Sequence, residues 1–215
     1  MHKLERGEAP ICLGKFKHVQ HTWDELTPQD REEIWVALEA MQGQCCAYCE
    51  CDISNGRRHI EHFRQKAGHR YPQGAFEWVN LFGSCIHPTR CGSHKDKLGE
   101  YSHEDLIKPD EEDPESFFIF MRDGTIRLRN LSTSDERRAQ ETLRIFNLDE
   151  KRGRLRQMRE SAVYGYIQIA NEILELAEIC PDKEWRQYLD GELDKIKSLP
   201  FATAIKHTLT NQNRL

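Results

Sequence analysis

Apolar residues recur at helical spacing in two parts of the chain. The first part covers 27–43, where Thr27 is a good N-cap before a proline and Gly43 ends the apolar stripe. The second part begins near Ser134, a candidate N-cap, and continues almost to the end of the chain. Two prolines interrupt it, Pro181 and Pro200. The pattern therefore predicts an N-terminal helix and a mainly helical C-terminal region.

Shorter apolar runs between these parts predict strands. Residues 117–121 and 125–129 alternate on either side of Asp123-Gly124, which is a strong hairpin signal. A short strand is expected to lead into 58–61, and 92–99 is compatible with a short helix. The predicted fold class is therefore α+β.

Length and composition restrict the class of protein. The chain has 215 residues, 38% of them hydrophobic and 31% charged, with a formal net charge of −5, which is typical of a globular protein with a modest core. No apolar run approaches the roughly 18–20 residues that cross a bilayer, and the N-terminus lacks an apolar stretch like that of a signal peptide. These features predict a cytoplasmic protein with no membrane association.

Charge is distributed unevenly along the chain. Residues 57–97 contain eight Lys/Arg against three acids, and 122–159 contain eleven against six. Such basic segments can gather a polyanion even on an acidic protein, although charged helix faces explain the second segment equally well. The stretch 104–115, with seven acids and one lysine, is predicted to be a solvated linker. The expected divisions are 1–26 as an N-terminal segment, 27–103 as a core, 104–133 as linker and hairpin, and 134–215 as a helical region.

The cysteines predict a metal site. Six of the eight fall between positions 45 and 91, and a chain with no export signal favours metal ligands or buried thiols over disulfides. Cys46 and Cys49 form a CxxC pair, and Cys85 and Cys91 supply a second pair, so that four thiolates suit a structural zinc ion. Three nearby residues keep the ligand set open: Cys45, Cys51 and His87. Unrelated buried thiols remain the alternative.

A second group of residues has the chemistry of a catalytic site. Glu61 and His94 suit a second cation of mixed oxygen and nitrogen preference, and His62 suits a general base that activates water. Asn80 is a candidate to orient the imidazole of His62. In a strand, His59 and Glu61 face together and His62 faces away, so this assignment requires the strand to end or bend at Glu61–His62.

These motifs together resemble the HNH endonucleases of the ββα-metal fold, over about residues 28–100. More narrowly, they are similar to the HNH subunit, PtuB, of Septu-type and retron-associated anti-phage systems. The strings that carry the resemblance are Cys46-x-x-Cys49, His59-Ile60-Glu61-His62-Phe63-Arg64, Trp78-x-Asn80-Leu81-Phe82 and Cys85…Cys91-Gly92-x-His94-Lys95.

The resemblance implies a zinc-stapled ββα-metal core that hydrolyses phosphodiester bonds in DNA or RNA. It assigns His62 as the general base and Asn80 as the middle residue of the motif, with His59 beside them as a further catalytic candidate. Glu61 and His94 correspond to ligands of a catalytic Mg²⁺ or similar ion, and the four cysteines to the zinc ligands. Four basic residues are candidates for phosphate contacts: Arg64, Lys66, Arg90 and Lys95.

The same resemblance implies a defence complex. Its partner would be a PtuA-like ATPase, and in retron-associated systems also a reverse transcriptase complex. The chain has no phosphate-binding loop of its own, and residues from about 134 onward are expected to dock on the ATPase, or otherwise to form a helical lid.

Two other functions fit part of the sequence. A zinc nucleobase deaminase would use His59-Ile60-Glu61 as its His-x-Glu motif, but the downstream Pro-Cys-x-x-Cys is missing. A non-catalytic zinc adaptor that binds nucleic acid or protein would explain the cysteines and the basic residues. It would leave the His, Glu and Asn residues of the motif without a role.

Overall fold

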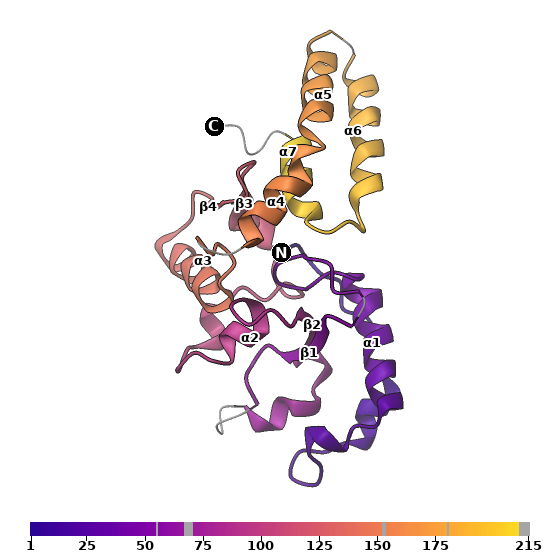
Figure 1. Ribbon diagram of the computed structural model, residues 1–215, viewed down its shortest axis with the longest axis vertical. Coiled ribbons are helices and arrows are strands. Elements are labelled where there is room, and N and C mark those ends of the chain that lie inside the picture. The colour runs from indigo at the N-terminus through magenta and orange to yellow at the C-terminus, as the bar shows by residue number, and fades with distance from the viewer. Residues whose placement is uncertain (55, 67–70, 152–153, 180, 211–215) are drawn as a thin grey trace.

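The computed structural model describes residues 1–54, 56–66, 71–151, 154–179 and 181–210. Within these residues it contains seven α-helices and two two-stranded antiparallel sheets, which confirms the mixed α+β class (Figure 1). Short 3₁₀ turns connect them, at Ile11–Lys15, Trp23–Glu25, Pro72–Phe76, Trp78–Asn80, His103–Asp105 and Pro114–Ser116. No helix in the described ranges combines the length and apolar character that a membrane crossing requires.

The first helix, α1, spans Pro28–Gln42 as its pattern predicts. The Thr27 hydroxyl accepts a hydrogen bond from the Asp30 amide at 3.2 Å, and the Asp30 carboxylate accepts one from the Thr27 amide at 3.1 Å. This reciprocal pair satisfies two amides that a helix start leaves without partners. Gly43 ends the helix at a φ of +63°, a conformation that costs glycine little.

A strand–strand–helix unit follows α1. Strand β1, Arg58–His62, pairs with β2, Leu81–Cys85, with His59 opposite Ser84 and Glu61 opposite Phe82. The short helix α2, Cys91–Lys95, packs against β2. The element order agrees with the predicted core, whereas its assignment to the ββα-metal fold stays a prediction.

The second sheet is the predicted hairpin. Strand β3, Phe118–Phe120, pairs with β4, Ile126–Leu128, through a turn at Asp123-Gly124. Gly124 has a φ of +77°, and a Cβ there would lie 2.0 Å from the carbonyl oxygen of Arg156. The turn therefore requires glycine on both conformational and steric grounds.

Five helices complete the chain. They are α3 Thr133–Phe146, α4 Arg154–Tyr164, α5 Ile167–Ile179, α6 Asp182–Ile196 and α7 Ala202–Leu209. The predicted N-cap Ser134 is wrong by two residues, because the hydroxyl of Ser132 accepts the Asp135 amide at 3.2 Å. Pro181 directly precedes α6, and Pro200 lies between α6 and α7, as the sequence predicts.

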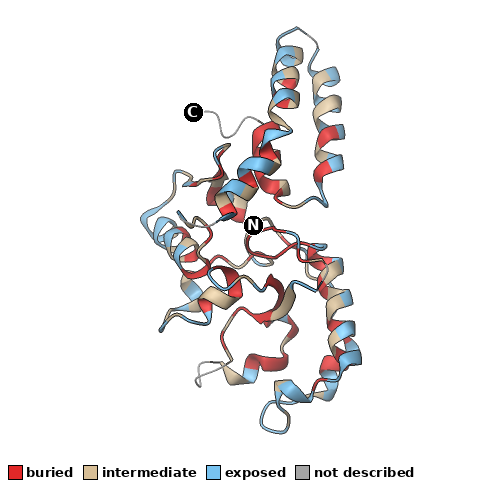
Figure 2. Cartoon of the chain, viewed as in Figure 1, coloured by how far each residue is buried: buried red, intermediate tan, exposed pale blue. Residues whose placement is uncertain are grey.

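Two apolar clusters hold these elements together. The larger one joins the N-terminal segment, the strand–strand–helix unit, the hairpin and parts of α3, α4 and α7 (Figure 2). The smaller one lies among α5, α6 and α7, and comprises Ala170, Ile173, Ile196, Ile205 and Leu209. In Figure 1, α5 and α6 form a hairpin that projects from the rest of the molecule.

The acidic stretch 104–115 is packed rather than solvated, which corrects the expectation of a solvated linker. Leu106 and Ile107 are buried in the larger cluster. The Asp110 carboxylate accepts a hydrogen bond from Arg6 Nε at 2.6 Å and is almost fully buried. Some acids of this stretch therefore form ion pairs, Asp110 with the N-terminal segment and Asp105 and Glu112 with arginines of α3.

Candidate functional site

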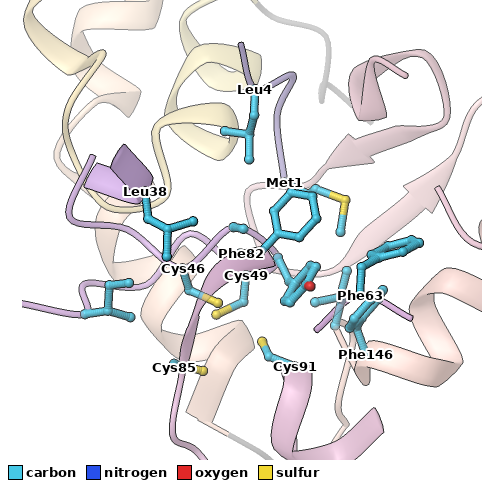
Figure 3. Close-up of a cluster of buried hydrophobic side chains, with 14 of the residues drawn as sticks. Met1, Leu4, Leu38, Cys46, Cys49, Phe63, Phe82, Cys85, Cys91 and Phe146 are labelled. Carbon is cyan, nitrogen blue, oxygen red and sulfur yellow. The ribbon is translucent and has the colours of Figure 1, made fainter. Parts of the chain in front are cut away.

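Four buried cysteines converge at one point in the core. Cys46 and Cys49 lie between α1 and β1, Cys85 ends β2, and Cys91 begins α2. Their sulfur atoms all lie within 4.8 Å of one another, and Figure 3 shows the thiols directed towards a common centre. Four thiolates at this spacing fit a tetrahedral zinc ion, so the predicted ligand set is the one that the fold brings together.

The three other candidate zinc ligands, Cys45, Cys51 and His87, are not among these four converging residues. Hydrogen bonding by Cys46 and Cys49, with that of Cys51 beside them, holds the pKa of the Cys85 thiol far below its ordinary value. Burial raises the pKa of Cys45 to about 12, which keeps it protonated. The Nδ1 atom of His87 lies 3.2 Å from the Thr89 hydroxyl. Cys51 is therefore a fifth thiol in contact with the metal-binding group.

Arg90 faces this group of thiols. It is only 5% exposed, and its Nε and Nη1 atoms have no hydrogen-bond partner among the described residues. Burial opposes its charge, but Cys49, Cys85 and Cys51 outweigh burial and raise the pKa of the guanidinium. The structure therefore places Arg90 beside the metal-binding group, and it leaves the predicted phosphate contact of this residue without support.

Glu61 is the centre of a buried ion pair. Its Oε1 lies 2.8 Å from Lys95 Nζ and its Oε2 lies 3.1 Å from His59 Nε2. Burial opposes the charge of both partners, yet Glu61 raises the pKa of His59 and of Lys95. A Cβ at Gly92 would lie 2.1 Å from Glu61 Oε2, so the carboxylate packs directly on the α2 backbone. Lys95, wholly buried, neutralises Glu61 and is not placed at the surface to meet phosphate.

His62 is the last residue of β1, so the strand ends where the general-base assignment requires it to end. Its Nε2 lies 3.0 Å from the carbonyl oxygen of Ala75, and its ring packs edge-on against Trp23 with centroids 4.5 Å apart. A carbonyl oxygen only accepts hydrogen bonds, so Nε2 carries the proton and Nδ1 keeps its lone pair. Burial, with Lys66 adding to it, lowers the pKa of His62 to about 4. The imidazole is therefore neutral near pH 7.

Asn80 fixes the chain that leaves β1. Its Oδ1 accepts the Arg64 amide at 2.7 Å, and its Nδ2 donates to the carbonyls of Arg64 at 3.1 Å and Gly74 at 3.0 Å. The predicted Asn80–His62 hydrogen bond is replaced by the bond between His62 and Ala75. Asn80 therefore positions Arg64, and through it the segment next to His62.

The predicted cation ligands Glu61 and His94 each have contacts within the protein. His94 Nδ1 lies 3.0 Å from the Ile145 carbonyl, and the oxygens of Glu61 face Lys95 and His59. Because a carbonyl oxygen only accepts hydrogen bonds, His94 Nδ1 carries the proton and Nε2 keeps its lone pair, which is the state of a histidine that can bind a metal. The Glu61–His94 pair accordingly stays a prediction.

Two of the predicted phosphate contacts are accessible. The guanidinium of Arg64 stacks over Tyr71, with its Cζ 4.3 Å from the ring centroid, and its Nη2 contacts His103 Nε2. Lys66 lies 4.9 Å from the Trp23 ring centroid, and burial lowers its pKa. Both belong to the segment that directly follows His62.

Sequence reasoning missed the backbone partner of His62 and the packing of Gly92. Every residue has a backbone carbonyl, so nothing in the sequence could have identified Ala75 as the partner of His62. Gly92 stands in the Cys-Gly-x-His-Lys string, and a glycine within a short helix is a signal for close approach.

The comparison with known proteins agrees with the nuclease resemblance. The chain is 28% identical over 137 residues to a protein of Vibrio cholerae serotype O1 biovar El Tor named "Retron Vc95 putative HNH endonuclease". The match covers 60% of this chain and 64% of the relative, so it spans less than two thirds of that protein. No family model matches the chain. The similarity supports an HNH-type nuclease.

Proposed function

We propose that this protein is a nuclease that hydrolyses phosphodiester bonds in nucleic acid. The observation that carries the proposal is the state of His62, a neutral imidazole whose Nε2–H is bound to the Ala75 carbonyl and whose Nδ1 remains a base. His62 lies between a buried carboxylate, Glu61, and a basic segment that begins at Arg64. The similarity to a retron nuclease supports the same chemistry.

The reaction assigns a distinct task to each group. His62 Nδ1 removes a proton from water, and the resulting hydroxide attacks phosphorus. The bond from phosphorus to the 3′ oxygen breaks, and that oxygen takes up a proton from solvent to become a hydroxyl. Arg64 and Lys66 contact phosphate oxygens and stabilise the charge that develops on them. His59, about one-third exposed and bound to Glu61, is a second proton-transfer candidate at the same strand.

The zinc ion has a structural task in this proposal. The four thiols would hold it and fix β2 and α2 against the loop that contains Cys46 and Cys49. Participation of Mg²⁺ through Glu61 and His94 is a separate proposal, and no step is assigned to it. Cleavage measured with and without added Mg²⁺ gives this dependence directly.

The test compares cleavage by the wild-type chain, His62→Ala and the control His18→Ala at an exposed histidine, each with zinc content measured. Plasmid DNA, single-stranded DNA and total tRNA serve as substrates, with and without added Mg²⁺. Loss of a general base should slow cleavage about 10²–10⁴-fold with zinc content unchanged. Cleavage by His62→Ala at the wild-type rate would refute the role of His62. Zinc without cleavage, even with the partner added, would favour the adaptor.

The arrangement of the cysteines and of His59 argues against a zinc deaminase. A zinc deaminase needs an open coordination position and a histidine or cysteine set of three ligands. Here four cysteines lie together, and His59 is bound to Glu61 instead of joining them. The zinc adaptor remains the second candidate, since the metal-binding group alone would serve it.

We further propose that the protein is the HNH subunit of a Septu-type or retron-associated defence complex with a PtuA-like ATPase and, in a retron, a reverse transcriptase complex. The supporting features are the name of the relative and the projecting α5–α6 hairpin, where Ile179 is 78% exposed. Truncation before α3 would not test this, because Phe146 stacks on Tyr48 in the core. Ile179→Glu should instead reduce co-purification with the ATPase while zinc content is retained. Unchanged co-purification would contradict docking at this hairpin.

A further inference from the structure

A cavity of about 590 Å³ opens beside the segment that leaves β1. Arg64, Tyr71, Tyr101 and His103 line it, with Gln65, Glu100 and Ser102. This volume is within the range of sites for small ligands and nucleotides. It combines one permanent cation with two aromatic rings, which is the composition of sites that bind single-stranded nucleic acid.

Arg64 is held in place for a ligand. Its backbone amide and carbonyl are both bound to Asn80, and its guanidinium stacks on Tyr71. Its Nε is buried and has no hydrogen-bond partner among the described residues. A fixed guanidinium with an unused donor is well suited to a phosphate oxygen.

His103 adds a second nitrogen at the same place. Arg64 Nη2 donates to His103 Nε2, so Nε2 is the acceptor and Nδ1 carries the proton. Burial, followed by the charge of Arg64, lowers the pKa of His103. The pair therefore presents a charged donor and a neutral donor on one wall. The only carboxylate among the residues that line this cavity, Glu100, is exposed to solvent.

We propose that this cavity binds one unpaired nucleotide of the substrate, with its phosphate on Arg64 and its base against Tyr71 or Tyr101. A base within a duplex is stacked on both faces and cannot enter a cavity unless it is extruded. The site therefore selects single-stranded or locally unpaired nucleic acid. This inference rests on the proposed nuclease function and specifies its substrate class.

The role of Asn80 follows from the same geometry. It is a positioning residue, because it touches Arg64 and not the imidazole of His62. Through Arg64 it joins the nucleotide cavity to the segment that holds the proposed general base. Cleavage is therefore expected close to the nucleotide that occupies the cavity.

The test measures binding by fluorescence anisotropy in a His62→Ala background, which prevents cleavage. Probes are a labelled 12-nucleotide single strand and a fully paired hairpin, each as DNA and as RNA. Arg64→Gln is compared with Lys183→Gln, which removes one exposed positive charge from α6. We expect the single strand to bind at least tenfold more tightly than the hairpin, and Arg64→Gln alone to lose this preference. Equal affinity for both probes, or no effect of Arg64→Gln, would overturn the proposal.

A second measurement locates the base. A 2-aminopurine placed at successive positions of the strand should be quenched at one position by stacking on tyrosine, and Tyr101→Leu or Tyr71→Leu should restore its emission. Circular dichroism melting checks that each variant is folded. Uniform emission at every position would contradict a base-binding cavity.

The two proposals can fail separately. Selective single-strand binding without cleavage by the wild type would reject the nuclease and keep the cavity. Cleavage of paired DNA by the wild type, with equal affinity of the His62→Ala protein for the paired and single-stranded probes, would keep the nuclease and reject the cavity.

Discussion

At the scale of single residues, buried cations distinguish structural from substrate-binding positions. Arg90, Lys95 and Arg64 are all basic residues near the candidate site. Arg90 and Lys95 are buried, whereas Arg64 is partly exposed and lines the cavity beside the segment that leaves β1. Arg90 is fixed beside thiols and Lys95 beside a carboxylate. A cation is buried at this depth only where an anion compensates the loss of hydration.

The position of Arg90 predicts an effect on zinc. A zinc ion with four thiolates carries a net charge of about −2, and a buried guanidinium beside it lowers the energy of that charge. Arg90→Gln should therefore release zinc at least tenfold faster, as followed with a chromophoric chelator. Arg57→Gln, at an exposed arginine, is the control. Equal release rates for both variants would show that Arg90 does not stabilise the metal.

Gly92 predicts a steric effect at Glu61. In Gly92→Ala, the new Cβ would meet the buried carboxylate at 2.1 Å and push it away from Lys95. Overpacking and a weakened buried ion pair should together cost about 1–3 kcal/mol of unfolding free energy. Gly99→Ala is a matched control, because nothing lies within 4 Å of its Cβ position. Urea denaturation would show the difference, and equal midpoints would contradict the close packing.

At the scale of elements, α7 is attached to β3 and to the turn before it, Pro114–Ser116. The carboxylate of Glu115, in that turn, accepts hydrogen bonds from Lys206 Nζ at 2.9 Å and His207 Nε2 at 3.1 Å. The other ring nitrogen of His207 accepts the Phe120 amide at 3.0 Å. Because that nitrogen is an acceptor, His207 is neutral and transmits the contact from β3 to the carboxylate.

This contact predicts a pH dependence of stability. Burial opposes ionisation of Glu115, but His207 and Lys206 outweigh it and lower its pKa to about 2. A lowered folded-state pKa stabilises the protein fully above the ordinary value of 4.5 and loses that effect as the pH falls towards 2. Glu115→Gln should cost at most about 3 kcal/mol at pH 7 and flatten stability between these limits. Thermal melts from pH 7 to 2.5 test this, and a parallel loss in both proteins would contradict it.

Local sequence signals predicted the helices and strands better than they predicted which distant residues pack or bond together. The helix after Thr27 and the hairpin around Gly124 follow from caps, periodicity and turn residues, all of which act within a few positions. Ser132 and Ser134 could not be separated, since each precedes acidic residues that suit a first turn. The burial of Leu106 within an acidic stretch depends on packing against distant segments, which charge counts do not contain.

The candidate site divides in the same way. The four cysteines were predicted because CxxC spacing and thiol chemistry are local, and the fold brings those four together. The hydrogen-bond partners of His62, Asn80 and His94 were not predicted, because all of them are backbone groups. The two histidines bond to carbonyls, and Asn80 bonds to an amide and to carbonyls. Backbone groups are identical in every residue, so the sequence carries no mark of them.

At the scale of the whole molecule, the metal-binding group is connected to the C-terminal helix. Glu50 follows Cys49 directly, and its carboxylate accepts the Thr203 amide at 3.0 Å and the Thr203 hydroxyl at 2.6 Å. Its own carbonyl accepts the Phe201 amide at 3.0 Å. The N-terminus and the start of α7 therefore meet at Glu50, since the Met1 amino group also contacts this carboxylate. The conformation of Glu50 is set by the loop that the metal would hold.

Zinc removal should therefore release α7 together with the cysteine loop. Without the ion, four buried thiols no longer fix residues 46–49, and Glu50 loses its position opposite Thr203. Hydrogen exchange with and without a zinc chelator should show at least tenfold faster exchange of the Phe201 and Thr203 amides. The amides of 184–189 serve as the internal control, because they lie at the end of α6 that is joined to α5 and away from α7 (Figure 1). If these residues loosened as much as the start of α7, the metal would stabilise the molecule generally and not through Glu50.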